Sequence, residues 1–211
     1  MAYNYKKYLK TYESIIETPG GKEKLTLRPL TTNDMKKLLV YENENDPLIA
    51  EKILDDILTD TVTTENYNVD NQYIQDRYFT FIKLREVTKG SIYKFPYTCK
   101  NPDCKLQTVQ KIDLSKLNVK PMEIKEDKVK LLDNNLTLQM GFFTRGKQKE
   151  AYSLIDDNLS ATEKQIEMML ADLALMIQSI KTPEGEDKPE IKDMMEFIGD
   201  LPQKEYDVLK E

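Results

Sequence analysis

The sequence has no histidine and no tryptophan, and only two cysteines among its 211 residues. Because histidine is absent, the chain cannot build a Ser-His-Asp or Cys-His catalytic group, an HExxH zinc site or a histidine pH switch. The chain could still use the chemistry of carboxylates, lysine, tyrosine or phosphate binding, or it carries out no chemistry at all. The length suits one domain, or one domain with a small inserted subdomain, and is enough to bury a core without disulfides.

Long apolar runs and an excess of positive charge are also missing. No run approaches the roughly 20 apolar residues that cross a bilayer, and the basic N-terminal residues are not followed by the apolar stretch of a signal peptide. The net charge is −6, from 37 acidic and 31 basic residues, whereas general nucleic-acid binding needs a concentrated basic face. We therefore expect neither a membrane nor a nucleic-acid partner, and a protein of the cytosol or of a particle assembled there.

Periodicity and turn residues predict an α+β fold, in which a helical body carries a central β-rich insert with a cysteine hairpin. We divide the chain into residues 1–90 (an N-terminal arm, a hairpin and helices), 91–143 (the β-rich part) and 144–211 (a helical part that packs on the first). The predicted elements are a hairpin over 12–27, helices that begin after Thr31 and at Pro47, a helix over about 70–89 that Gly90 ends, and strands between 91 and 143.

The clearest predicted element is a helix that begins after Ser160. Ser160 and Glu163 form a capping box, in which each side chain bonds the other residue's backbone amide. Apolar residues at helical spacing then extend the helix to residue 180. They are Ile166, Met169, Leu170, Leu173, Met176, Ile177 and Ile180. A charged loop over 182–189 and two short helices, over 188–198 and 203–209, complete the chain.

The two cysteines, Cys99 and Cys104, lie between two predicted strands, in the place of a zinc knuckle. Zinc prefers four ligands, usually cysteine or histidine, and this chain has no other cysteine and no histidine. A zinc site would need carboxylates such as Asp103, or a second copy of the chain. A disulfide and a metal-free hairpin tip are the alternatives, and the absence of a full ligand set favours the metal-free tip, with no cofactor.

Residues 141–147 fit the pattern GxxxxGK, which in a P-loop cradles phosphate between a strand and a helix. The position after Lys147 is Gln148, where a P-loop has Ser or Thr to hold magnesium, and Phe142 and Phe143 occupy the loop. The preceding strand also belongs to a predicted antiparallel hairpin. We therefore interpret the segment as a strand-to-helix turn, with both phenylalanines packed in the core or on a partner.

Two further groups of side chains suggest a site, one for a cation and one for a protein partner. Asp56 and Asp60 share a helix face with Asp55 nearby, which suggests a cation site, but no further ligands converge in the sequence. We interpret these carboxylates as a solvated acidic face. Tyrosines at the N-terminus fit an arm that docks on a partner, since tyrosine brings contact area and a hydroxyl at low entropy cost. These tyrosines are Tyr3, Tyr5, Tyr8 and Tyr12.

A series of short motifs runs along most of the chain in a recognisable order. They are LRPLT at 27–31, a KLR…GSIY segment at 83–93, YTC…C at 97–104, KIDL at 111–114, IQSI at 177–180 and FIGDLP at 197–202. In this order the chain resembles the small baseplate hub proteins and hub-assembly chaperones of T-even-type contractile-tailed phages.

The resemblance implies a non-enzymatic structural or assembly protein of the phage baseplate hub that acts by protein–protein recognition. Its partners would be hub proteins or further copies of itself, in the host cell cytoplasm or in the virion tail. The partner-facing residues we expect are Tyr3, Tyr5, Tyr8, Phe142 and Phe143, together with the cysteine hairpin. The alternatives are a zinc-knuckle-like interaction module of another cytosolic complex, and a nucleotide-dependent enzyme that uses Lys147.

Overall fold

The computed structural model describes residues 14–20, 24–101, 104, 106–117, 127–132 and 135–210. The fold is α+β, as predicted from the sequence. In chain order the elements are β1 (Ser14–Glu17), β2 (Lys24–Leu27), α1 (Thr32–Glu42), α2 (Pro47–Thr61), η2 (Val69–Asn71), α3 (Ile74–Lys89), β3 (Ile92–Thr98), β4 (Gln107–Asp113), η3 (Leu114–Lys116), β5 (Asp127–Leu131), β6 (Leu136–Met140), α4 (Arg145–Tyr152), α5 (Ala161–Met176), β7 (Ile177–Thr182), β8 (Gly185–Asp187), α6 (Ile191–Gly199) and α7 (Gln203–Lys210).

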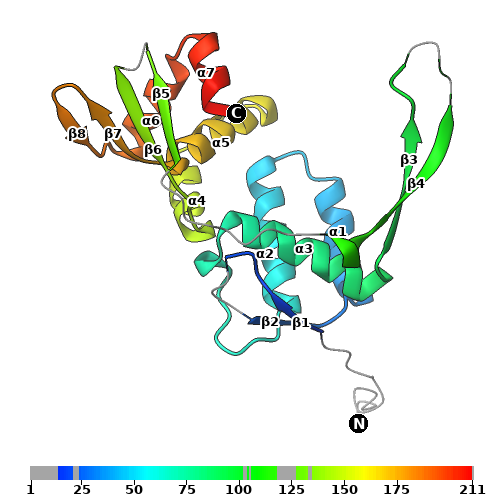
Figure 1. Ribbon diagram of the computed structural model, residues 1–211. Coiled ribbons are helices and arrows are strands. Elements are labelled where there is room, and N and C mark those ends of the chain that lie inside the picture. The colour runs from blue at the N-terminus through cyan, green and yellow to red at the C-terminus, as the bar shows by residue number, and fades with distance from the viewer. Residues whose placement is uncertain are drawn as a thin grey trace.

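The N-terminal lobe, described over 14–20 and 24–90, packs the β1–β2 hairpin against α2 and α3 (Figure 1). Helices α1 and α2 begin, and α3 ends, where the sequence predicts, whereas α3 begins at Ile74 rather than near residue 70. Thr31 and Asp34 form a capping box at α1, Asp46 caps α2 ahead of Pro47, and Gly90 ends α3 with a φ of 84°. Glycine suits this last position because it lacks the Cβ that disfavours positive φ. The lobe's core consists of Ile16, Leu25, Leu27, Ile57, Val62 and Leu84.

The C-terminal lobe, described over 127–132 and 135–210, is built on an antiparallel sheet with the order β5-β6-β7-β8. Helices α5, α6 and α7 gather on one side of this sheet (Figure 1). The predicted capping box of Ser160 and Glu163 is present at the start of α5. Within the described residues, no helix is both long enough and apolar enough to span a membrane.

The helix predicted to reach residue 180 ends at Met176, and its last predicted residues form β7 instead. The Gly141 N–H donates to the Met176 carbonyl at 2.7 Å, and Leu138 of β6 lies opposite Ile180. The spacing of apolar residues predicts a helix here, but the same residues pair with β6 as a strand. The β-branched side chains of Ile177 and Ile180 favour the strand. The predicted charged loop that follows is also wrong in part, because it contains β8.

The strands predicted between 91 and 143 divide between two sheets. Strands β3 and β4 pair only with each other, whereas β5 and β6 join β7 and β8 in the C-terminal lobe. The predicted boundaries at 90 and 143 stay a prediction. The sheet order nevertheless shows that β5 and β6 belong structurally with the C-terminal helices, because β6 pairs with β7 on the side away from β5.

Candidate functional site

The β3–β4 hairpin extends away from both lobes, and we name residues 92–113 the projecting hairpin (Figure 1). Its strands are in continuous antiparallel register from Ile92 opposite Asp113 to Thr98 opposite Gln107. No residue of either strand is buried. A two-stranded hairpin without a core is marginally stable in water, so a contact surface on another molecule would stabilise it.

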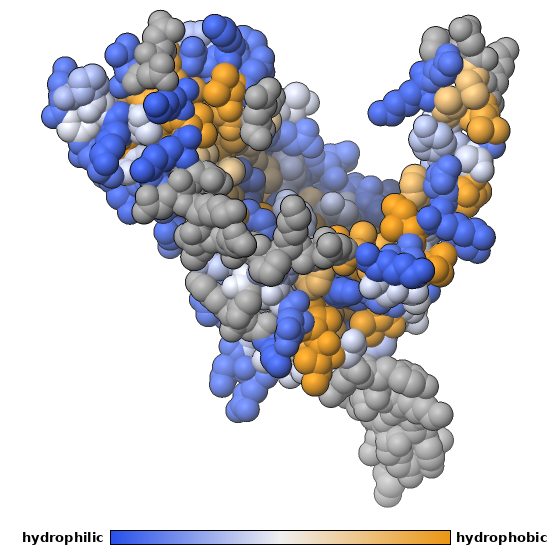
Figure 2. Space-filling view, viewed as in Figure 1, coloured by the Kyte–Doolittle hydropathy of each residue, from blue (hydrophilic) through white to orange (hydrophobic). Residues whose placement is uncertain are grey.

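One face of the projecting hairpin is aromatic and apolar. Tyr93, Phe95 and Tyr97 alternate along β3 and therefore share this face, where Ile112 lies opposite Tyr93. Tyr93 is 43% exposed, Tyr97 37% and Ile112 40%. The Tyr93 and Phe95 rings stack with their centroids 5.8 Å apart. Hydrophobic residues are visible along the hairpin in Figure 2, and such a stripe is typical of a protein-binding surface.

The opposite face of the projecting hairpin carries two lysines beside the exposed apolar side chains of Ile92 and Val109. Lys94 lies directly opposite Lys111, and neither forms an ion pair with the described residues. Like charges at directly opposed positions destabilise a strand pair. The hairpin therefore carries an electrostatic cost that a negatively charged partner would relieve.

The root of the projecting hairpin is fixed to α3. The Arg85 guanidinium lies over the Tyr93 ring at 5.1 Å and donates to the Ile92 carbonyl at 3.1 Å. The Leu114 N–H donates to the Ser91 carbonyl at 2.9 Å, and the Leu114 side chain is buried. These contacts fix the direction in which the hairpin leaves the N-terminal lobe.

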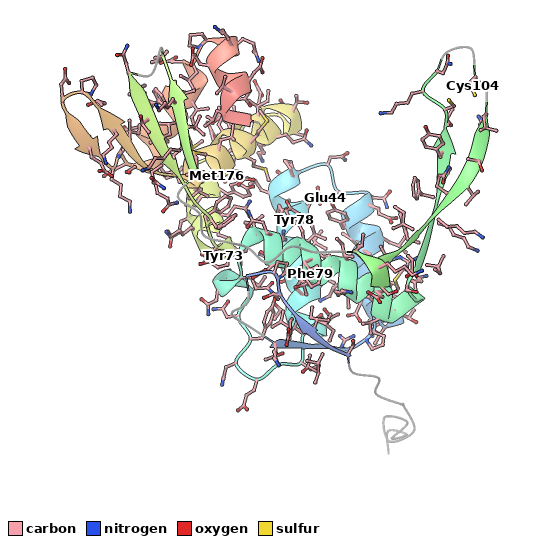
Figure 3. The ribbon with its side chains drawn as sticks, viewed as in Figure 1. Glu44, Tyr73, Tyr78, Phe79, Cys104 and Met176 are labelled. Carbon is pink, nitrogen blue, oxygen red and sulfur yellow. The ribbon has the colours of Figure 1, made fainter. Side chains whose placement is uncertain are left out.

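The two cysteines are free thiols at the far end of this hairpin (Figure 3). The Cys99 N–H continues the ladder by donating to the Leu106 carbonyl at 3.0 Å, and the Cys104 N–H donates to the Asn101 carbonyl at 2.9 Å. Asp103 lies outside the described residues. Among those described, no group of three or more potential ligands gathers. Two thiols are half of the set that zinc prefers, so a zinc site here stays a prediction that needs donors from another chain.

The predicted partner-facing phenylalanines lie in the connection between β6 and α4. Phe143 is only 5% exposed, and its carbonyl accepts a hydrogen bond from the Ile74 N–H at 3.4 Å. The Phe142 ring makes an edge contact with Tyr73, with centroids 6.3 Å apart. The structure therefore corrects the prediction for Phe143, which packs inside this chain. Tyr3, Tyr5 and Tyr8 lie outside the described residues, and their role stays a prediction.

The GxxxxGK segment donates its amides within the protein. The Gly141 N–H donates to the Met176 carbonyl, and the Arg145 N–H donates to the Gln72 carbonyl at 2.8 Å. A Cβ at Gly146 would lie 3.1 Å from the Asp70 carbonyl oxygen, so this glycine is needed for close packing. A P-loop instead directs its amides at phosphate. The geometry favours the strand-to-helix turn.

A buried ionic cluster, which the sequence analysis missed, lies where the two lobes meet. Asp55, predicted to be on a solvated face, is 4% exposed. It accepts from Arg77 Nε at 3.0 Å and pairs with Arg145 Nη2 at 2.9 Å and Lys149 Nζ at 3.2 Å. Glu51 lies 3.0 Å from Arg77 and 3.4 Å from Arg145. The chain has only four arginines, and two of them are in this cluster.

One more contact crosses between the lobes, and another lies beside the junction within the C-terminal lobe. Lys164 of α5 is buried and pairs with Asp46 at the start of α2, and this bond lowers the pKa of Asp46. Asp172 of α5 accepts from Gln148 at 2.7 Å and from the Tyr152 hydroxyl at 3.0 Å. Burial raises the pKa values of both Asp172 and Tyr152, because it disfavours the charged form of each side chain. The lobes are thus joined by polar contacts that act within the chain.

A comparison with known protein families bears directly on the identity of the chain. Residues 10–211 match the model of the family described as T4 bacteriophage base plate protein. The chain belongs to this base plate family. The match covers almost the whole chain and confirms the resemblance to phage baseplate proteins. No curated protein and no solved structure matches. As a base plate protein it has a structural role in phage tail assembly.

Proposed function

We propose that this base plate protein is a non-enzymatic subunit or assembly factor of the baseplate hub, which binds other hub proteins through the projecting hairpin. The observation that carries the proposal is that β3 and β4 have no buried residue, yet present aromatic side chains on one face. Exposed aromatic residues of this kind are enriched in interfaces. Assembly would take place in the host cell cytoplasm, before or during construction of the tail.

The rest of the described chain supports the hairpin as the contact element. The buried charges at the lobe junction are neutralised by one another, so they serve folding rather than a partner. The hairpin root is fixed by Arg85, which holds the aromatic face in a constant direction. A pre-organised surface loses less entropy when it binds.

The test is co-expression of the full chain with other hub proteins of the same phage, followed by size-exclusion chromatography. We expect wild-type protein to co-elute with at least one of them and Tyr97→Ala to weaken the complex by about tenfold or more, as for an aromatic anchor. Val109→Ala is the matched control, because Val109 is 59% exposed on the opposite face of the same hairpin. If folded wild-type protein elutes alone with every candidate, or Tyr97→Ala binds as wild type does, the proposal is wrong.

A further inference from the structure

A shallow groove on the C-terminal lobe lies between the end of α4, α5 and α6. Its apolar part consists of Leu154, Leu170 and Met195. Leu154 is 53% exposed, although it is a large aliphatic residue next to the lobe's core. The groove therefore offers apolar area that this chain's own packing leaves open to contact.

The edge of the groove is acidic. Glu167 of α5, with Glu196 and Asp200 at α6, lines it beside a single lysine, Lys192. Within the described part of the chain, none of these three carboxylates forms an ion pair. The groove is thus apolar in its floor and negative at its edge.

The projecting hairpin has the complementary character. Residues 92–113 contain four lysines and two aspartates, although the whole chain has a net charge of −6. Near the tip, Leu106 is 58% exposed and Tyr97 is 37% exposed. An apolar, basic projection and an apolar, acidic groove therefore occur in one chain, and opposite potentials of this kind direct association.

We propose that the projecting hairpin of one copy docks in the α5–α6 groove of a second copy. This inference rests on the proposed function, since it names the hairpin's partner. Within one chain the tip and the C-terminal lobe lie on opposite sides of the N-terminal lobe (Figure 1), so the contact forms between copies. If two copies exchange hairpins reciprocally, the association closes as a two-fold dimer, whereas a head-to-tail arrangement continues into a ring or an open filament.

Nucleic acid is the other class of partner that an aromatic, lysine-bearing hairpin could bind. Single-strand binding needs cations along the same surface on which the bases stack. Here Lys94 and Lys111 lie on the face opposite Tyr93, Phe95 and Tyr97. This placement favours a groove on a protein, because a hairpin inserted in a groove is contacted on both of its faces.

The test measures the self-association of the full chain by analytical ultracentrifugation at about 50 mM salt, where charge interactions are weakly screened. Wild-type protein is expected to form oligomers that dissociate at about 500 mM salt. The hairpin double variant Lys94→Glu/Lys111→Glu and the groove double variant Glu167→Lys/Glu196→Lys should each weaken association by about tenfold or more. Glu184→Lys, a charge reversal at an exposed position of the same lobe outside the groove, is the control and should associate as wild type does.

The decisive sample is an equimolar mixture of the two double variants. A normal hairpin then meets a normal groove, and a reversed hairpin meets a reversed groove, so we expect association to return. A monomeric wild type, a groove variant that associates normally, or a mixture that stays monomeric overturns the inference. If the wild type is monomeric but co-elutes with hub proteins through Tyr97, the proposed function stands and only this inference fails. Binding of a labelled oligonucleotide that the hairpin variant loses also overturns it.

Discussion

Arg145 on α4 donates from Nε to both carboxylate oxygens of Asp55 on α2, at 3.1 and 3.0 Å, although the two residues are 90 positions apart. Arg77 of α3 reaches the same carboxylate from the N-terminal lobe. One buried carboxylate thus joins three helices and both lobes. The direction of the projecting hairpin relative to the C-terminal lobe depends on this junction.

Replacing Asp55 by alanine should destabilise the fold severely. The change removes the carboxylate that accepts from both Arg77 and Arg145 and leaves these two buried guanidinium groups to share Glu51. Breaking a buried ion pair typically costs about 3–5 kcal/mol. Chemical denaturation followed by circular dichroism measures the loss. Asp56→Ala, at the exposed neighbouring position on the same helix, should change the free energy of unfolding by less than about 0.5 kcal/mol. Equal effects of the two changes would contradict the role of the cluster.

Asp172→Asn should stabilise the protein at neutral pH, because about 1.4 kcal/mol of stability is lost for each unit by which burial raises the pKa of the carboxyl. Burial raises the pKa of Asp172 above its usual range, so the folded state binds its proton more tightly than the unfolded state does. The wild type therefore loses stability as the pH rises from about 4 through the raised pKa. Asparagine can still accept both hydrogen bonds, which go to one oxygen. Thermal denaturation between pH 4 and pH 8 should show the advantage of the variant growing with pH; an advantage that shrinks would contradict this.

Asp34 should show the opposite pH dependence. Burial alone would raise the pKa of Asp34, but hydrogen bonds from Arg28 and Thr31 outweigh it and lower the pKa to about 2. Its contribution to stability is complete above its unfolded pKa of about 4 and is lost as the pH falls towards 2. Asp34→Asn should cost about 1–2 kcal/mol at pH 7. In denaturation at several pH values, the gap between variant and wild type should close near pH 2, and a constant gap would argue against the assigned cause.

Elements with local signals could be predicted from the sequence, whereas those that depend on distant partners could not. The Pro47, Gly90 and Ser160 boundaries follow from the chemistry of adjacent residues, and the structure confirms them. Strand β7 forms because its residues hydrogen-bond to β6, which lies far earlier in the chain. The role of Asp55 depends on Arg77 and Arg145, so its short-range pattern with Asp56 and Asp60 was misleading. The scarcity of arginine was the one available signal, since buried ion pairs favour arginine.

The candidate site shows the same division. The cysteine hairpin was predicted from its strands and turn residues, but its exposure on both faces was not, because only the positions of the lobes reveal that none of the described residues covers it. Phe143 was predicted to face a partner, yet its side chain is buried and its carbonyl accepts from the Ile74 N–H of α3. Composition identifies residues suited to contact, and packing decides which of them remain available.

Two glycines provide a last, paired prediction about the C-terminal lobe. A Cβ at Gly141 would lie 2.7 Å from Gln178 Cγ, whose side chain donates to the Leu175 carbonyl at 3.1 Å. Gly141→Ala should therefore cost about 1–3 kcal/mol, as overpacking does. At Gly199, the last residue of α6, no atom lies within 4 Å of an added Cβ. Gly199→Ala should stabilise the protein by about 0.5–1 kcal/mol, because alanine loses less backbone entropy in a helix. Urea denaturation of both variants measures the two changes, and effects of the same sign would contradict the packing described at the junction of β6, α5 and β7.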